Sequence, residues 1–318
     1  MRLFSIFILC CAFFACQRDE KKTEDLSALR IAYNVYYDTA TDDYEIFVMN
    51  ADGSGQKNIS NSNGVDWVYF AYKDKLYFIS DRDTTHRMYF LYEMDADGNN
   101  VRKVSNLRLE DSWMSSRNDG KEMVVSGRVG KEVRYQLFLI DITSGDFSQL
   151  TTDTTASFAD PCFSPDGTQI VFRHRTNRRN FVNEKAELWI MNADGTGKRQ
   201  LTHYPAGDTT AEWHSYHAGP PYWEPNRNLI SYISRQKGNH SIFTISPNGG
   251  ASVQLTPDSN NEGWHAWSPV GEWIVYDGSD LSDSGYDIFL MRADGSGIKR
   301  LTTDWRTEQA PVFVAAPR

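Results

Sequence analysis

Apolar residues along this chain come in short runs separated by turn residues, and no stretch shows the periodicity of an amphipathic helix. A typical run, Ile46-Phe47-Val48-Met49, leads into Asp52-Gly53 and then into a second short segment that closes on Ser60. Glycine after aspartate supplies the positive φ that a tight turn needs. The pattern therefore predicts a β-hairpin over residues 44–60.

The same seventeen-residue hairpin recurs along the chain, with intervals of 45, 46, 51, 54 and 46 residues between copies. The six copies are 44–60, 89–105, 135–151, 186–202, 240–256 and 286–302. A second hairpin precedes most copies, with Ser-Pro-Asp-Gly at 164–167 and Ser-Pro-Val-Gly at 268–271. Two hairpins per repeat make a four-stranded antiparallel unit, so six repeats predict an all-β, six-bladed β-propeller.

The two ends of the repeat region indicate how such a ring would close. Residues 29–33 resemble only the second strand of a repeat, so the first repeat lacks its innermost strand. Residues 310–314 follow the sixth repeat and match that missing strand. We expect the C-terminal strand to complete the first blade and to remove the open edges that favour aggregation.

The first fifteen residues have the composition of a secretion leader. Arg2 precedes an apolar stretch from Leu3 to Ala15, too short for a good membrane span, and a charged segment follows. Ala15-Cys16 resembles the lipobox of bacterial lipoproteins, which implies cleavage before Cys16 and its acylation; a plain secretion signal is the alternative. The predicted organisation is a signal peptide at 1–15, a tether at 16–28 and a propeller at 29–318.

Composition narrows the class of protein further. The chain has 318 residues, 40% of them hydrophobic, and a formal net charge of −9, which argues against general binding to nucleic acids or anionic membranes. Cys162 is the only cysteine of the predicted propeller, so an internal disulfide is impossible there. It lies in an apolar strand, and we expect a buried side chain rather than a reactive thiol.

The repeat pattern resembles a known family. Ser-Pro-Asp-Gly followed by an apolar run, and then Met-Asn-Ala-Asp-Gly before Leu-Thr, is similar to the TolB-type, WD40-like (PD40) propeller repeats over residues 29–314. This resemblance implies the propeller fold. TolB itself carries an additional N-terminal α/β domain. Because the segment between Cys16 and the first strand is short, we expect neither that domain nor a Tol–Pal role here.

Two insertions depart from the repeat, at 173–185 and 203–219, and the topology places both at the same end of the ring. Arginines in an otherwise acidic protein are suited to a carboxylate, sulfate or phosphate. The predicted ligand-binding residues are Arg173, Arg175, Arg178, Arg179, Tyr216 and Trp264. A solvated protrusion without a specific site remains the alternative for these loops.

Histidines gather in the same part of the sequence, with His174, His203, His214 and His217 in the insertions and His265 expected to reach the same mouth. A fainter resemblance to oligogalacturonate lyase propellers implies a metal-dependent lyase. In that alternative His174 acts as base and Arg175 or Arg178 steadies the carboxylate of a uronate-containing sugar. His214, His217 and His265 would then bind a divalent metal, Mn or Ca.

The favoured hypothesis is a binding scaffold without a cofactor. No G-x-S-x-G, phosphate loop, dinucleotide fingerprint or C-x-x-C motif is present. We expect a monomeric lipoprotein, held on the outer membrane through its lipid anchor only, that binds an envelope protein, a peptide or an anionic oligosaccharide and no nucleic acid. Gln17 and Arg18 after Cys16 lack the aspartate associated with retention in the inner membrane.

Overall fold

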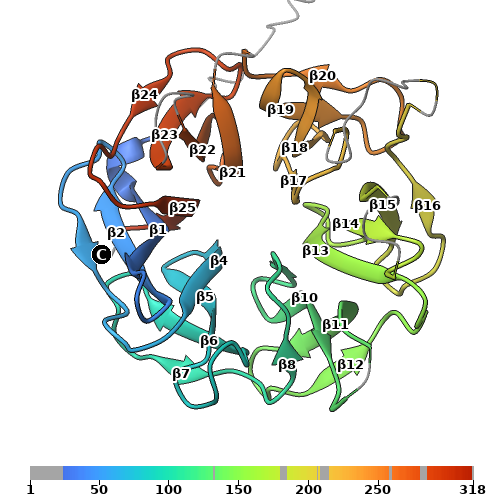
Figure 1. Cartoon of the computed structure of the whole chain (residues 1–318), viewed down its shortest axis with the longest axis horizontal. Helices are drawn as coiled ribbons and strands as arrows, with labels where there is room; N and C mark the ends of the chain where they lie inside the picture. Colours follow the sequence, from blue (N-terminus) through green and yellow to red (C-terminus); the bar gives the residue numbers. More distant parts are fainter. Residues whose placement is uncertain are drawn as a thin grey trace, which may run out of the picture.

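The computed structural model is a ring of six β-sheets arranged like blades around a central axis (Figure 1). It describes residues 24–131, 133–179, 185–205, 207, 215–257, 260–279 and 285–316. Neighbouring strands within each sheet are antiparallel. The predicted all-β, six-bladed propeller is confirmed. No helix in these ranges is long and apolar enough to cross a membrane.

The strands of each blade follow one another from the channel outward. Blade one contains β25 (Glu308–Ala315), β1 (Leu29–Asp38), β2 (Asp43–Asn50) and β3 (Lys57–Asn58), and blade two contains β4 (Asp66–Tyr72), β5 (Lys75–Ser80), β6 (Phe90–Asp95) and β7 (Arg102–Lys103). Blade three contains β8 (Arg108–Leu109) and β9 (Ser115–Arg117), then β10 (Glu122–Arg128), β11 (Gln136–Asp141) and β12 (Phe147–Gln149).

Blade four contains β13 (Ser157–Phe163), β14 (Gln169–Arg175), β15 (Glu187–Asn192) and β16 (Arg199–Gln200). Blade five contains β17 (Pro221–Trp223), β18 (Ile230–Lys237), β19 (Asn239–Ile245) and β20 (Val253–Gln254), and blade six contains β21 (Asn261–Trp267), β22 (Trp273–Ser279), β23 (Asp287–Arg292) and β24 (Lys299–Arg300). One short 3-10 helix, η1 (Leu26–Ala28), precedes β1.

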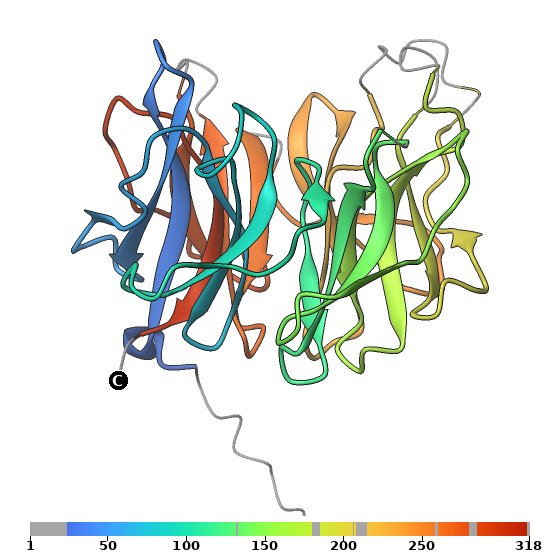
Figure 2. The same cartoon turned by 90° about the horizontal axis from the view of Figure 1, so that it is seen from below.

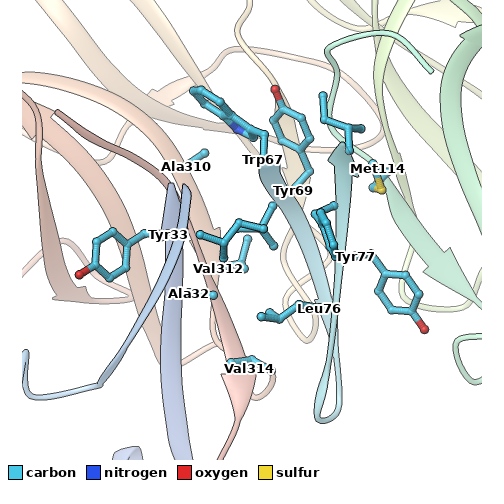
Figure 3. Packing of buried hydrophobic residues seen from close by; sticks show 14 of the residues in the cluster. Ala32, Tyr33, Trp67, Tyr69, Leu76, Tyr77, Met114, Ala310, Val312 and Val314 are labelled. Carbon is cyan, nitrogen blue, oxygen red and sulfur yellow. The ribbon is translucent and has the colours of Figure 1, made fainter. Parts of the chain in front are cut away.

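The ring closes as the ends of the sequence predicted. Strand β25 pairs with β1, with Arg30 opposite Val314 and Leu29 opposite Ala315, and so supplies the innermost strand of blade one. Figure 3 shows Val312 and Val314 of β25 between Ala32 of β1 and Leu76 of blade two. All four side chains are buried, so the closing strand also joins blade one to blade two.

The structure explains why the recurring hairpin ends on serine or threonine. In five of the six repeats the closing serine or threonine accepts a hydrogen bond from the backbone at the start of the blade's third strand. The bonds run from Ile46 to Ser60, Leu137 to Thr151, Leu188 to Thr202, Ile242 to Thr256 and Ile288 to Thr302, at 2.8–2.9 Å. These hydroxyls attach the short outermost strand to the blade, because β3 or β16 alone offers only two residues for pairing.

Blade three differs from the expected four strands because its inner strand is interrupted between β8 and β9. The intervening chain bonds instead to blade four: Trp113 N and the Ser112 hydroxyl both donate to Asp160 Oδ1, at 3.0 and 3.1 Å. Asp160 N donates back to Ser112 Oγ at 2.7 Å. These contacts between residues 47 or 48 positions apart replace the regular pairing of one strand.

Candidate functional site

The channel has two different ends, seen in profile in Figure 2. We call the end with Ala316 and the first described residues the lower end; there lie the turns between the first and second strands of the blades, such as 164–168 and 268–272. The upper end carries the loops between second and third strands and the crossovers to the next blade. The described parts of both predicted insertions belong to the upper end.

A pocket of about 470 Å³ occupies the lower part of the channel. Its walls come from the inner strands of all six blades and are mostly apolar. They include Phe70 of blade two, Trp113 and Met114 of blade three, Pro161 and Cys162 of blade four, Pro221, Tyr222 and Trp223 of blade five, Trp267 of blade six and Phe313 of blade one. A concave apolar space of this size is typical of a ligand site.

Prolines at this pocket follow from the position of the inner strands. An inner strand pairs on one side only, since its other side faces the channel, and proline, which has no N–H, is tolerated on such an edge. Pro161 lies where β13 slips in register against β14, and Pro221 begins β17. The backbone thus presents proline rings and aromatic side chains to the channel.

Two polar side chains that line the pocket, Cys162 and Lys73, are already engaged by neighbouring groups. Burial raises the pKa of the Cys162 thiol to about 11, and its sulfur accepts a hydrogen bond from Trp223 N at 3.4 Å. A thiol with this pKa is protonated near neutral pH and is a poor nucleophile. Lys73 at the lower rim pairs with Asp119 at 2.8 Å. The expected burial of Cys162 is confirmed.

At the upper end the predicted arginines have different surroundings. Arg173 forms an ion pair with the buried Asp160, with 2.7 Å between Nε and Oδ2. Arg178 donates from its backbone to Thr155 O and from its side chain to Thr154 O, both at 2.8 Å. Arg175 is half-buried, whereas Arg179 is exposed. Arg173 and Arg178 are therefore engaged in contacts that stabilise the propeller itself.

His174 and His265, the first and last of the predicted histidine cluster in sequence, lie in separate blades. His174 is buried in blade four, where its Nδ1 is 3.0 Å from Ser157 O and its ring packs on Phe158 and Trp189. His265 is enclosed in blade six, with Nε2 2.6 Å from Ser231 Oγ, and burial lowers its pKa to about 3. The prediction that His265 reaches the upper mouth is therefore wrong. The alternation of side chains along β21 directs it into the core.

The remaining predicted residues are placed only in part. His214 and Cys16 lie outside the described residues. Tyr216 and His217 are half-buried, and the Tyr216 ring meets Tyr204 edge-on at 5.5 Å. Within the described ranges no three His, Cys, Asp or Glu side chains are grouped so as to hold a metal ion. The metal set that includes His214 stays a prediction.

Trp264 of β21 is half-buried, and its ring meets Trp67 of blade two edge-on at 5.8 Å. Its backbone N donates to Asp277 Oδ1 at 2.8 Å, and burial raises the pKa of Asp277 to about 8. The carboxylate approaches the strand so closely that a Cβ at Gly263 would lie 1.6 Å from Oδ1. Gly263 is thus required for the local path of β21.

The sequence analysis missed the lower pocket. Its aromatic and proline residues stand just before the turns between first and second strands in blades four, five and six, and the sequence pattern assigns them to the repeat and to packing between blades. The signal that could have found the pocket is a proline two positions before an aromatic residue, in Pro161-Cys162-Phe163 and Pro221-Tyr222-Trp223. Proline at such positions indicates a channel-facing strand edge.

Comparison with known proteins agrees with this architecture. Residues 32–184 match the family model described as PD40, TolB beta propeller domain. The Tol-Pal system protein TolB of Anaeromyxobacter dehalogenans is 30% identical over 126 residues, which cover 39% of this chain and 26% of that protein. An uncharacterized peptidase, YuxL of Bacillus subtilis, is 24% identical over 42% of this chain and 18% of its own length. The matched segments thus span about a quarter or less of these relatives.

Solved structures show the likeness over most of the chain. TolB from Acinetobacter baumannii superposes with a TM-score of 0.69 at 16% identity, covering 91% of this chain and 67% of that one. A manganese complex of oligogalacturonate lyase superposes with a TM-score of 0.52 at 11% identity, covering 86% and 72%. The described chain thus has the fold of the TolB β-propeller, and residues 32–184 match the PD40 repeat that the sequence predicted.

Proposed function

We propose that this TolB-type propeller is a lipid-anchored binding scaffold of the cell envelope, and that it holds an apolar segment of an envelope protein or peptide in its lower pocket. The observation that carries the proposal is the pocket of about 470 Å³. Aromatic and proline side chains surround it, and burying apolar area there contributes about 25 cal/mol per Å². Polypeptide segments with apolar side chains suit such walls.

An anionic glycan suits this pocket less well. A sugar carboxylate needs cationic or hydrogen-bonding partners, and Lys73 at the rim is paired with Asp119. At the upper end, Arg173 is engaged with Asp160 and Arg178 with two backbone carbonyls. We therefore favour the peptide over the oligosaccharide among the ligands that the sequence left open.

Binding is tested by capture from envelope extracts with the mature chain, comparing Tyr222→Ala with Tyr37→Ala. Tyr222 lines the lower pocket, whereas Tyr37 is exposed on the upper face, so the two variants remove the same side chain at opposite ends. The parent and Tyr37→Ala should retain the same partner and Tyr222→Ala should lose it. Retention by Tyr222→Ala with loss by Tyr37→Ala would contradict a lower-pocket site.

Salt separates the two kinds of ligand. Apolar burial is not weakened by screening, so capture should persist between low and high salt and in the presence of a chelator. An anionic ligand held by arginines would instead dissociate as the salt concentration rises. Capture that falls steeply with rising salt would contradict the lower pocket and favour a site at the arginines of the upper face.

The anchor is a separate part of the proposal, because Cys16 lies outside the described residues. Its support is the leader and the Ala15-Cys16 junction. Mass spectrometry of the mature protein should find an N-terminal Cys16 carrying acyl chains, in the outer-membrane fraction. An unmodified mature N-terminus elsewhere in the chain would refute the anchor without touching the pocket.

A further inference from the structure

The chain enters the propeller at the rim of the lower pocket and is held there. Glu24 accepts hydrogen bonds from the hydroxyl of Ser268 and from Val270 N, the latter at 3.1 Å. Its own backbone N donates to Glu272 Oε2 at 2.9 Å. These partners belong to the turn between β21 and β22, and Ser268 also lines the pocket. We call Glu24 with this turn the tether latch.

The latch limits how far the propeller can stand from its anchor. Cys16 and Glu24 are eight positions apart, so a fully extended backbone between them spans at most about 29 Å. Without the latch, the tether would extend to Asp25, the N-cap of η1, and the reach would grow to about 32 Å.

Both the latch and the start of β1 lie at the lower end of the ring (Figure 2). The ten residues of β1 rise about 33 Å from there to the upper end. A propeller turned with its upper face to the membrane would have to cover this height as well as the gap to the bilayer. A fully extended tether of about 29 Å is shorter than this height, so it does not allow that arrangement.

We propose that the tether latch holds the lower face of the propeller, and with it the mouth of the pocket, toward the membrane that carries the anchor. The surface that this face meets is the lipid headgroup layer, at a distance of no more than the tether. The upper face, with both insertions, points away from the membrane. A segment that enters the pocket then does so from the membrane side. The inference rests on the proposed anchor at Cys16.

Energy transfer to a labelled bilayer tests the orientation. The mature chain from residue 17, with an N-terminal His tag in place of the acylated cysteine, is bound to vesicles containing nickel-chelating lipid and an acceptor dye in the headgroup layer. Single cysteines replace Gln56 or Thr39 in a Cys162→Ser background. Both positions are exposed on blade one, Gln56 at the lower end and Thr39 at the upper end.

Transfer from position 56 should exceed transfer from position 39 by about twofold or more, since the positions are separated by roughly the length of β1. Glu24→Ala should lower transfer from position 56, because losing the bonds to Ser268 and Val270 lets the propeller tilt on its tether. The matched control, Glu20→Ala, removes the same charge from the tether outside the described residues and should leave both values at those of the parent.

Equal transfer from both positions in the parent, or higher transfer from position 39, would overturn the proposed orientation. Identical values for Glu24→Ala and the parent would overturn the role of the latch. Since the tag replaces the lipid, these outcomes do not depend on acylation in the cell. The mass of the natural N-terminus tests that part independently.

Discussion

Single polar side chains on the second strands hold the irregular inner strands in place. Asn34 bonds to the backbone of Val68 in the next blade, at 2.7 and 3.0 Å, and Ser126 donates to Phe158 O at 2.8 Å. Asp277 accepts from Ala310 N at 2.7 Å across the closure of the ring. Arg173 has the equivalent position in blade four and pairs with Asp160. A residue that the sequence suggests as ligand-binding, such as Arg173, can thus stabilise the fold instead.

Removing the Arg173 side chain should destabilise the fold. Asp160 is 2% exposed, and Arg173→Ala would leave its carboxylate buried without the ion pair, at a cost of about 3 kcal/mol in the free energy of unfolding. Urea unfolding measures it. Arg179→Ala, at an exposed position of the same segment, should change the value by no more than about 0.5 kcal/mol. Equal effects of the two substitutions would argue against a structural role for Arg173.

His265 should make the fold sensitive to acid. Because burial lowers its pKa in the folded state from 6.5 to about 3, the unfolded chain binds a proton that the folded chain does not. Its contribution is fully present above about pH 6.5 and is lost as pH falls toward about 3, by up to about 1.4 kcal/mol per pH unit. His265→Gln keeps a hydrogen-bonding group without this titration.

The measurement is the difference in unfolding free energy between about pH 7 and about pH 4, which spans most of this titration. That difference should shrink in His265→Gln and not in His203→Gln, a substitution of an exposed histidine. The comparison within each variant removes any constant loss of stability. An unchanged acid dependence in His265→Gln would show that other groups determine it.

At the scale of elements, the closing strand determines whether the ring holds together. Val312 of β25 is 3% exposed and lies against blades one and two. A charge there would be buried without a partner, so Val312→Asp should cost several kcal/mol, about 3 or more, and expose an unpaired strand edge. Unfolding and size-exclusion chromatography should show lower stability and association.

Val253→Asp is the matched control, since Val253 on the outermost strand of blade five is 64% exposed. It should behave like the parent within about 0.5 kcal/mol. If Val312→Asp were equally harmless, the C-terminal strand would not be the closure of the ring.

The sequence was sufficient to predict these elements because the fold is a repeat. The Asp-Gly turn, the closing hydroxyl and the period each reflect a local bond, such as that between Ser60 and Ile46, within one blade. The split inner strand of blade three was not predictable in this way. It depends on Asp160 meeting Ser112 across two blades, a contact that no local pattern records.

At the scale of the whole molecule, the sequence predicts a ligand surface at the upper end of the ring, whereas the structure has an apolar pocket at the lower end. Sequence reasoning located the site in the upper insertions, because departures from a repeat are easily seen. The lower pocket is built from residues inside the repeat, and they form a pocket only because they converge on the axis of the ring. Pro161 and Tyr222 belong to different blades, 61 positions apart, and meet only when the ring closes.

Site-specific photo-cross-linking in intact cells tests the central claim most directly. A photoreactive phenylalanine analogue placed at Tyr222 lies in the lower pocket, and the same analogue at Tyr37 lies on the upper face. We expect a defined polypeptide adduct from position 222, lost when the analogue stands at position 37. Adducts from position 37 with none from position 222 would contradict a channel that binds its partner through the lower pocket.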